Sequence, residues 1–349
     1  MILSKSDFRG AVDAVTPFAR TKSPLPILTH VKVESTGKRI TFTASHIDSQ
    51  IEHWIDATGE KFAVCIDAAA LKKFASVCDA DVSLTVKGKK AVLECGDKKT
   101  RLNTLEADTF PMMKKVDQVL TEIEWKLVED KIAFAVQFCG MNPSMPQLNC
   151  LQLNSTGAQL EIFATDTKKI GFESVPHIAT AFGVCIPNET ARHMVGSFVS
   201  MVVREEQIEL RSDNAIALFK TAPYKPVKID KFITRAFPSQ GEISRKSLLE
   251  AINFVGSFSD SGKIRSRVEI HSGDSNIVKL ISTENEASAP FDYSGAPLAF
   301  GAFPDEFSSF LKSVETDKLK IEFDTADMNS TPIRLTNAGR VIIAMPVAI

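Results

Sequence analysis

The sequence has few of the patterns that mark membrane proteins, metal proteins or secreted proteins. No apolar run approaches the roughly 18 residues that a membrane helix needs, and residues 1–8 include polar residues where a secretion signal would be apolar. The six cysteines form no C-x-x-C pair, and the six histidines show no H-x-x-x-H spacing. We therefore expect reduced thiols in a cytoplasmic protein, with no zinc site and no cofactor.

Motifs for nucleotide binding and nucleophilic catalysis are also missing. The nearest match to a phosphate-binding loop begins at Gly256, but it has five residues between its glycines instead of four. Ile264 stands where such a loop needs a Ser or Thr to bind Mg²⁺. There is no G-x-S-x-G sequence either. These absences favour a binding or structural protein, although an enzyme with a dispersed active site would leave no such motif.

Length and charge are those of an ordinary globular protein. The chain has 349 residues, of which 44% are apolar, and its 41 basic and 43 acidic side chains give a net charge of −2. This length is enough for two or three domains. The charge balance does not indicate nucleic-acid binding, but it is compatible with a local basic patch.

What the sequence does contain is a threefold internal repeat. Three kinds of segment recur in the same order: an alternating strand with a polar turn, an apolar strand followed by an amphipathic helix, and a hairpin. They occupy residues 42–54, 62–77 and 82–95, then 163–175, 182–198 and 200–212, then 280–293, 299–314 and 319–335. Cys65 and Cys185, for example, lie 120 residues apart. Strand-turn-helix patterns recur in any α+β protein, but that does not explain the constant step.

The repeat predicts three similar domains at residues 1–117, 118–239 and 240–349. The first helix of each domain is expected at 5–16, 128–139 and 245–255, where apolar residues follow helical spacing. The second helix is expected after the apolar strand. We therefore predict an α+β fold in which each domain has two helices on a mainly antiparallel sheet.

Basic residues are scattered along the expected helices. The usual interpretation of a charged helix face is that it is exposed to solvent. The alternative is that the basic faces of all the helices lie on one concave surface that faces a polyanion. The proline-containing loop with Arg20 and Lys22 adds two cations that could contact phosphate.

Several short motifs carry a family resemblance. FATDTKKI at 163–170, LPIL at 25–28, DTFP at 108–111, LN at 148–149 and the end VIIAMPVAI at 341–349 occur in an order that resembles the bacterial sliding clamp, the beta subunit of DNA polymerase III. The family has A-T-D-G-H-R-L at the first of these, so Thr167, Lys168 and Lys169 replace Gly, His and Arg. The resemblance covers the whole chain, and the family shares the threefold repeat.

The resemblance implies the clamp fold in a head-to-tail homodimer, a ring of six domains around duplex DNA. Such a ring is a processivity factor that tethers the polymerase and other replication proteins, and a separate ATP-driven loader opens it. It is not an enzyme, and its cations attract phosphates without reading sequence. The alternative is a three-repeat peptide-binding scaffold that does not encircle DNA.

The resemblance also implies three sets of site residues. The peptide-binding pocket would comprise Leu148, Thr165, Thr167, Lys168, Lys169, Ile170, Arg235, Ile264, Phe303, Ile333, Ile343, Ala344, Met345, Pro346, Val347, Ala348 and Ile349. The DNA-binding residues would be Arg20, Lys22, Lys72, Lys73, Asn142, Arg192, Arg245 and Lys246. Ring closure would involve Phe110, Met112 and Phe258.

Overall fold

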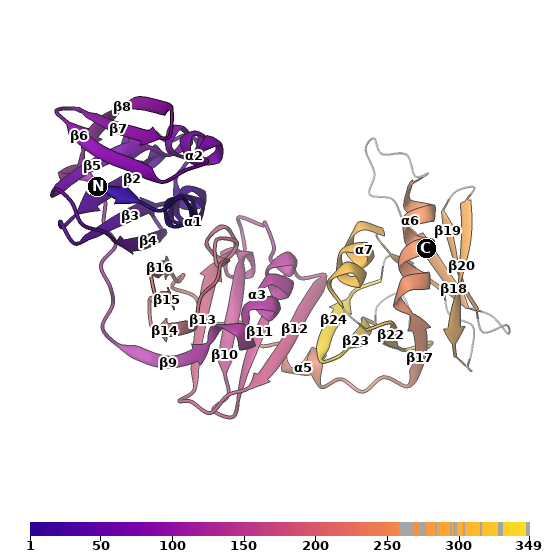
Figure 1. Cartoon of the computed structure of the whole chain (residues 1–349). Coiled ribbons are helices and arrows are strands. Elements are labelled where there is room, and N and C mark those ends of the chain that lie inside the picture. Colours follow the sequence, from indigo (N-terminus) through magenta and orange to yellow (C-terminus); the bar gives the residue numbers. More distant parts are fainter. Residues whose placement is uncertain are drawn as a thin grey trace. The chain divides into compact units, whose positions relative to one another are not determined.

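Antiparallel strands with short helices packed on them make up both compact units of the chain (Figure 1). This computed structural model describes residues 1–257, 268–272, 277–282, 285–293, 295, 299–302, 304–314, 316–326 and 331–346. Unit 1 comprises Met1–Asp130 and Val184–Tyr224, and unit 2 comprises Lys131–Gly183 and Lys225–Ile349. Within the described residues, no helix is both long enough and apolar enough to cross a membrane.

The sheet of unit 1 has the strand order β1-β6-β7-β8-β5-β2-β3-β4-β16-β15-β14-β9. The strands are β1 (Ile2–Leu3), β2 (His30–Ser35), β3 (Arg39–Ser45), β4 (Ser49–Asp56), β5 (Phe62–Asp67), β6 (Val82–Lys87), β7 (Lys90–Cys95), β8 (Lys98–Glu106), β9 (Val119–Glu124), β14 (Ser200–Arg204), β15 (Gln207–Arg211) and β16 (Ala215–Lys220). Its helices are α1 (Lys5–Val15), α2 (Ala68–Val77) and the single turn α4 (Asn188–Ala191). Strand β13 (Phe182–Pro187) crosses from unit 2 into unit 1.

In the sheet of unit 2, β13 is followed by the strand order β10-β11-β12-β24-β23-β22-β17-β20-β19-β18-β21. The strands are β10 (Cys150–Ser155), β11 (Gln159–Thr165), β12 (Lys169–Pro176), β17 (Ser239–Ser244), β18 (Val268–Ser272), β19 (Ile277–Ser282), β20 (Asn285–Asp292), β21 (Ala299–Ala302), β22 (Lys318–Phe323), β23 (Ile333–Asn337) and β24 (Arg340–Ala344). The helices are α3 (Glu129–Ala135), α5 (Asp230–Ile233), α6 (Arg245–Ser257) and α7 (Pro304–Ser313).

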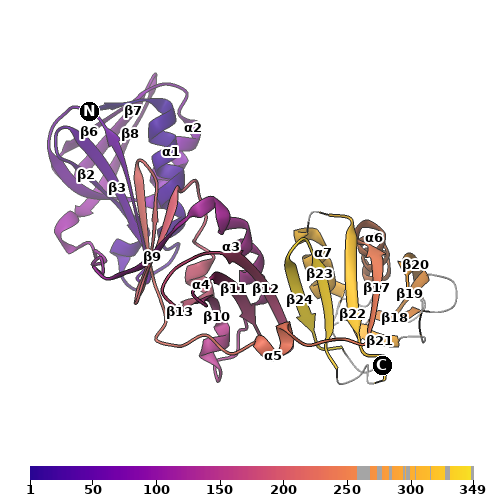
Figure 2. The same ribbon diagram turned by 90° about the horizontal axis from the view of Figure 1, so that it is seen from below.

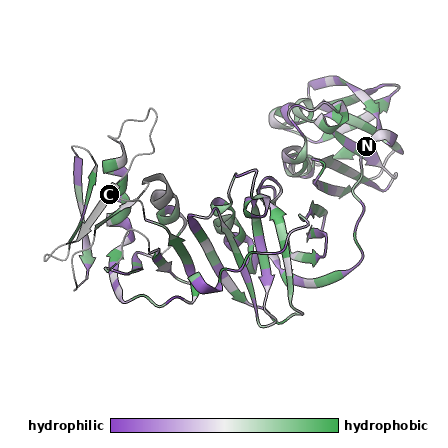
Figure 3. Ribbon diagram, turned by 180° about the vertical axis from the view of Figure 1, so that it is seen from behind, coloured by the Kyte–Doolittle hydropathy of each residue, from purple (hydrophilic) through white to green (hydrophobic). Residues whose placement is uncertain are grey.

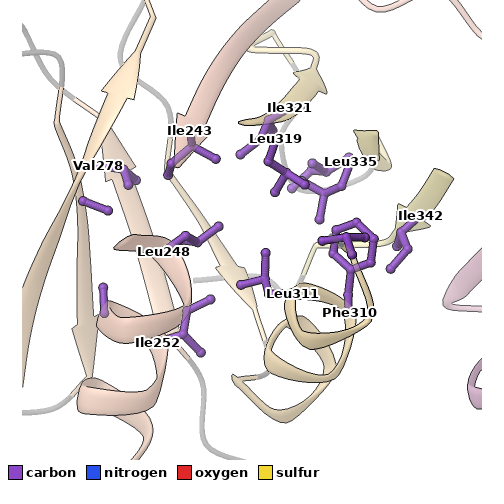
Figure 4. Close-up of a cluster of buried hydrophobic side chains, with 14 of the residues drawn as sticks. Ile243, Leu248, Ile252, Val278, Phe310, Leu311, Leu319, Ile321, Leu335 and Ile342 are labelled. Carbon is purple, nitrogen blue, oxygen red and sulfur yellow. The ribbon is translucent and has the colours of Figure 1, made fainter. Parts of the chain in front are cut away.

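The helices form where the sequence supplies a cap and an apolar stripe. Ser4 caps α1 by accepting a hydrogen bond from the Asp7 amide at 3.1 Å, and Phe8, Val12 and Val15 bury one face of the helix. In unit 2, α6 and α7 lie side by side in both views (Figure 2). Figure 4 shows their apolar faces meeting the strands, with Leu248 and Phe310 in the core.

The predicted hairpins are all present. The polar-turn segments are the antiparallel pairs β3–β4, β11–β12 and β19–β20, and the third kind of segment is β6–β7, β14–β15 and β22–β23. Figure 3 shows hydrophobic residues interleaved with hydrophilic ones along the strands. The antiparallel α+β fold predicted from the repeat is confirmed.

The second helix of the middle third differs from the prediction. After the equivalent strand, α2 has ten residues and α7 has ten, but α4 has only four. Asp67 caps α2 by accepting a hydrogen bond from the Ala70 amide at 2.8 Å, whereas Pro187 occupies the same position before α4 and offers no such acceptor. The helix therefore lacks a side-chain cap at its start, and it has only one turn.

The predicted middle domain, residues 118–239, is divided between the two units. Strands β9 and β14–β16 extend the sheet of unit 1, and β10–β12 extend that of unit 2. The threefold boundaries are defined by the repeat and not by compactness, so they stay a prediction from the sequence.

Candidate functional site

The turn between β11 and β12 forms one wall of the candidate site. Asp166 Oδ1 accepts hydrogen bonds from the amides of Lys168 and Lys169, both at 3.0 Å. Thr165 Oγ1 accepts one from the amide of Thr167, which has a φ of 81°. An Asp at the start of a turn stabilises it in this way, and the turn holds Thr167 in a left-handed conformation that non-glycine residues rarely adopt.

A cavity of about 160 Å³ lies beside this turn, entirely within unit 2. Its walls come from the turn, from Leu148 before β10, from the linker around α5, and from β23–β24. Leu148, Ile170 and Ile343 are nearly fully buried, whereas Phe232 and Met345 are 44% and 39% exposed. An apolar floor with half-exposed apolar side chains at its rim suits a ligand that brings apolar groups of its own.

Eight of the residues predicted for the pocket line this cavity. They are Leu148, Thr165, Thr167, Lys168, Lys169, Ile170, Ile343 and Met345. The predicted residues Ile264, Phe303, Val347, Ala348 and Ile349 lie outside the described residues.

The other four predicted pocket residues are not part of the lining. Ile333 is 2% exposed and belongs to the main core of unit 2, and Ala344 packs against that core. Arg235 lies over the ring of Phe237, 5.7 Å from its centroid. Pro346 is half-buried but does not reach the cavity.

Five lining residues were not expected from the sequence. They are Val227, Lys228, Ile229, Phe232 and Pro332. Four of them lie in the linker at residues 225–233, where the apolar stretch is too short to give a clear strand or helix pattern. The sequence signal that could have found them is a group of large apolar residues inside a polar linker, because such side chains need an apolar surface to pack against. That surface is a small cluster formed with Phe163 and Phe172.

The linker is attached to the sheet by its backbone as well. The buried side chain of Gln152 accepts a hydrogen bond from the Val227 amide at 2.7 Å. Ile229 is 6% exposed, so its side chain is fixed in the cluster below. Since the linker is held at both positions, this wall of the cavity is preformed.

The rim of the cavity is basic. Lys169 lies 3.7 Å from Asp166, and both side chains are largely shielded from solvent. Lys168 and Lys228 are exposed at the rim. An approaching ligand therefore meets positive charge around an apolar floor.

The residues predicted to contact DNA are in part exposed and in part engaged. Lys22, Lys72, Lys73, Asn142, Arg192 and Lys246 are exposed, and Arg20 is half-buried. Arg192 Nε donates to Asn188 Oδ1 at 2.9 Å. Arg245 is the exception, because its half-buried guanidinium donates to the Leu311 carbonyl at the end of α7. Its role in the fold is to join α6 to α7.

Two of the residues predicted for ring closure are described. Phe110 is 5% exposed in the single chain and packs inside unit 1 against Cys65 and Ala107, and its contact across the ring stays a prediction. Met112 is 46% exposed. Phe258 lies outside the described residues.

Besides the strands at the ends of each strand order, β8 and β20 have an edge that is partly without a partner among the described residues. In β8, Lys98–Asn103 pair with β7 on one side only. In β20, residues 285–290 pair with β19 on one side, and only Phe291 and Asp292 pair with β17 on the other. An open strand edge is a template for pairing with another chain.

Comparison with known proteins gives consistent matches. Residues 1–114 match the family model described as "DNA polymerase III beta subunit, N-terminal domain". The beta sliding clamp of Bacillus subtilis is 21% identical, over 97% of this chain and 96% of the relative, and that of Streptococcus pneumoniae is 20% identical, over 93% and 92%. Among solved structures, the DNA polymerase III beta subunit of Thermotoga maritima matches with a TM-score of 0.90, 16% identity and coverage of 100% and 99%. A Pseudomonas aeruginosa sliding clamp bound to griselimycin gives the same values.

Proposed function

We propose that the chain is a member of the family of bacterial DNA polymerase III beta subunits and that it acts as a sliding clamp. It is a processivity factor that encircles duplex DNA without reading its sequence and tethers a replicative polymerase. The observation that carries this proposal is the match in fold over the whole chain, with a TM-score of 0.90. In this role the chain carries out no reaction and acts in the cytoplasm, and a separate loader places it on DNA.

The threefold repeat supports a closed ring of two chains. Within unit 1, the turn-proximal part of β4 pairs with β16, and within unit 2 the equivalent β12 pairs with β24. The third copy of each partner is β20 and β8, and both have an open edge among the described residues. A head-to-tail dimer that pairs β8 of one chain with β20 of the other closes the ring by using the same joint again.

The two existing joints also define the register of the third. Gln50 faces Leu218 in the first joint, and Ile170 faces Ile343 in the second. When residues are counted from the hairpin turn, Glu286 has the position in β20 that Gln50 has in β4. Arg101 likewise has the position in β8 that Leu218 has in β16. The ring therefore places an acidic and a basic side chain opposite each other, and both are exposed in the single chain.

The cavity is proposed as the site where partner proteins attach. Its apolar floor and preformed walls suit the Leu and Phe side chains of a short peptide, and such buried anchors supply most of the affinity in peptide recognition. The basic rim would orient the peptide without contributing much affinity of its own. The polymerase and other replication proteins would compete for this one site.

Two measurements test the clamp reading. Light scattering should give twice the chain mass of 38.2 kDa at micromolar concentration. After loading, the protein should stay on circular DNA through a salt wash and leave when the circle is cut. A protein that remains a monomer and is not retained on circular DNA is a scaffold and not a clamp.

A matched pair of methionine variants tests the cavity. Met345→Ala should weaken binding of a peptide that ends in Leu-Phe by about 1–3 kcal/mol, because it removes an apolar wall. Met141→Ala is the control, since Met141 is 85% exposed and does not line the cavity. Equal binding by both variants would remove the cavity from the proposal.

A further inference from the structure

A second cavity of unit 2 adjoins the same linker and is larger than the first. Its volume is about 390 Å³. It shares Val227, Lys228 and Ile229 with the 160 Å³ cavity, so one stretch of linker is the wall between them. Neither the repeat nor the family resemblance assigns a role to this second cavity.

The floor of the second cavity offers hydrogen-bond acceptors. Asn154 on β10 faces Glu161 on β11 in the antiparallel ladder, and Asn154 Nδ2 donates to Glu161 Oε2 at 2.6 Å. This bond uses the amide's donor side and leaves Asn154 Oδ1 and Glu161 Oε1 as acceptors. Both side chains are half-buried, so a charge that meets them there is only partly screened by water.

Gly183 keeps the space next to these acceptors open. A Cβ at this position would lie 2.8 Å from Pro226 and 3.7 Å from Asn154 Oδ1. Any side chain at Gly183 would therefore occupy the region beside the amide oxygen. The remaining walls, from Pro226, Val227 and Ile229, are apolar at their side chains.

We propose that this cavity binds an arginine side chain of the same partner peptide whose apolar anchors fill the first cavity. A guanidinium has several donors in a fixed plane and no acceptor, which fits a floor of one carboxylate and one amide oxygen. Its aliphatic stem would pack on Pro226 and Val227. The charges at the outer edge, Lys225, Lys228 and Asp230, together with Glu161 sum to zero, so a cation is not repelled overall.

This inference rests on the proposed peptide-binding function of the first cavity and specifies its ligand. The shared wall supplies the connection. An extended peptide covers about 3.3 Å per residue, so a few residues suffice to cross a wall made of three linker residues. Partner peptides would then be distinguished by an arginine near their apolar pair.

The test compares fluorescein-labelled peptides that contain a Leu-Phe pair with one Arg placed two to six residues away on either side. Matched peptides carry Gln in place of Arg. At one or more spacings, the Arg peptide should bind about tenfold more tightly, as a charge-assisted hydrogen bond contributes about that much. Glu161→Gln should abolish the gain. Glu250→Gln, an exposed acid on α6, is the control and should retain the gain.

Three outcomes would count against the inference. Equal affinity of the Arg and Gln peptides at every spacing overturns it, and so does a gain that persists in Glu161→Gln, since the attraction would then come from elsewhere. If no Leu-Phe peptide binds at all, the first cavity is not a peptide site and the link to a peptide is lost. Saturation-transfer NMR with agmatine then tests whether the second cavity binds a guanidinium group without a peptide. A signal that disappears in Glu161→Gln supports a guanidinium site, and the absence of any signal overturns it.

Discussion

At the residue scale, the buried carboxylate of Glu209 joins three basic side chains on the face of the unit 1 sheet. It accepts hydrogen bonds from Arg204 Nη2 at 2.8 Å, Arg211 Nε at 2.5 Å and Lys115 Nζ at 2.9 Å, and its own side chain is fully buried. Burial by itself raises the pKa of a carboxyl group, but the hydrogen bonds from these cations outweigh it and lower the pKa of Glu209 to about 2.

The low pKa of Glu209 predicts a defined loss of stability in acid. A carboxyl group whose pKa is depressed in the folded state stabilises the fold above its unfolded pKa, and the contribution disappears as the pH falls from about 4.5 to about 2. Up to about 3 kcal/mol of the free energy of unfolding is involved. Glu209→Gln, which does not ionise, should be less stable at pH 7 and should lose this part of the pH dependence.

Tryptophan fluorescence in urea is the measurement for this prediction. Both tryptophans, Trp54 and Trp125, are in unit 1, so the signal follows the unit that contains Glu209. An unchanged pH profile in Glu209→Gln between pH 2 and 4.5 would show that other carboxyl groups cause the acid sensitivity.

A second residue-scale prediction concerns the strained turn at the first cavity. Thr167 has a φ of 81°, which costs a β-branched residue about 1–2 kcal/mol. Thr167→Gly should therefore raise the free energy of unfolding of unit 2 by about 0.5–1 kcal/mol after the extra entropy of glycine in the unfolded chain. Scanning calorimetry measures it. Lys168→Gly, in the same turn but without a positive φ, should be destabilising; if both variants lower stability, the turn is not strained.

At the element scale, the second helices of the first and middle thirds differ in the cap at their start. Asp67 supplies the acceptor for α2, and Asp67→Ala should lower the stability of unit 1 by about 1 kcal/mol, whereas Asp67→Asn, which keeps an acceptor, should not. Pro187→Asp introduces the same cap before α4 and should increase stability and helix content. Tryptophan fluorescence and circular dichroism measure the two effects. A Pro187→Asp variant with unchanged helix content would show that other residues end α4.

The same comparison explains what could be predicted from the sequence. The hairpins were predictable because alternation and a two-residue turn are local patterns, as in the segment that became β11 and β12. The length of α4 was not, since the pattern of apolar residues continues beyond Ala191, where the helix ends. For the cavity, the turn at residues 165–170 was found by resemblance. Val227 and Ile229 were missed, because only the tertiary contact with Gln152 and Phe163 shows where the linker lies.

At the scale of the whole molecule, two linkers, residues 111–118 before β9 and residues 225–233, are each fixed to a sheet by a buried glutamine side chain. Gln50 accepts a hydrogen bond from the Met113 amide at 2.8 Å, and Gln152 accepts one from Val227. In unit 1 the side chain of Gln207 also holds the linker, because it accepts a hydrogen bond from the Val116 amide and donates one to the Lys114 carbonyl. Since each unit repeats one sheet joint and one attached linker, the open edges of β8 and β20, which are the third copies of the paired strands, are expected to form the third joint between two chains.

The register of this third joint gives the sharpest test of the ring. Arg101→Glu or Glu286→Arg alone should place like charges opposite each other, at a cost of up to about 1 kcal/mol per joint. A closed dimer has two such joints, so the dimer dissociation constant should rise about 10- to 30-fold. The double variant, with the charges exchanged, should restore the dimer.

Arg9→Glu, an exposed charge on α1 rather than on an edge strand, is the control. Sedimentation velocity measures all four. Single variants that dimerise like the original chain would mean that β8 and β20 do not pair in this register, and a double variant that stays monomeric would mean that the two residues do not face each other.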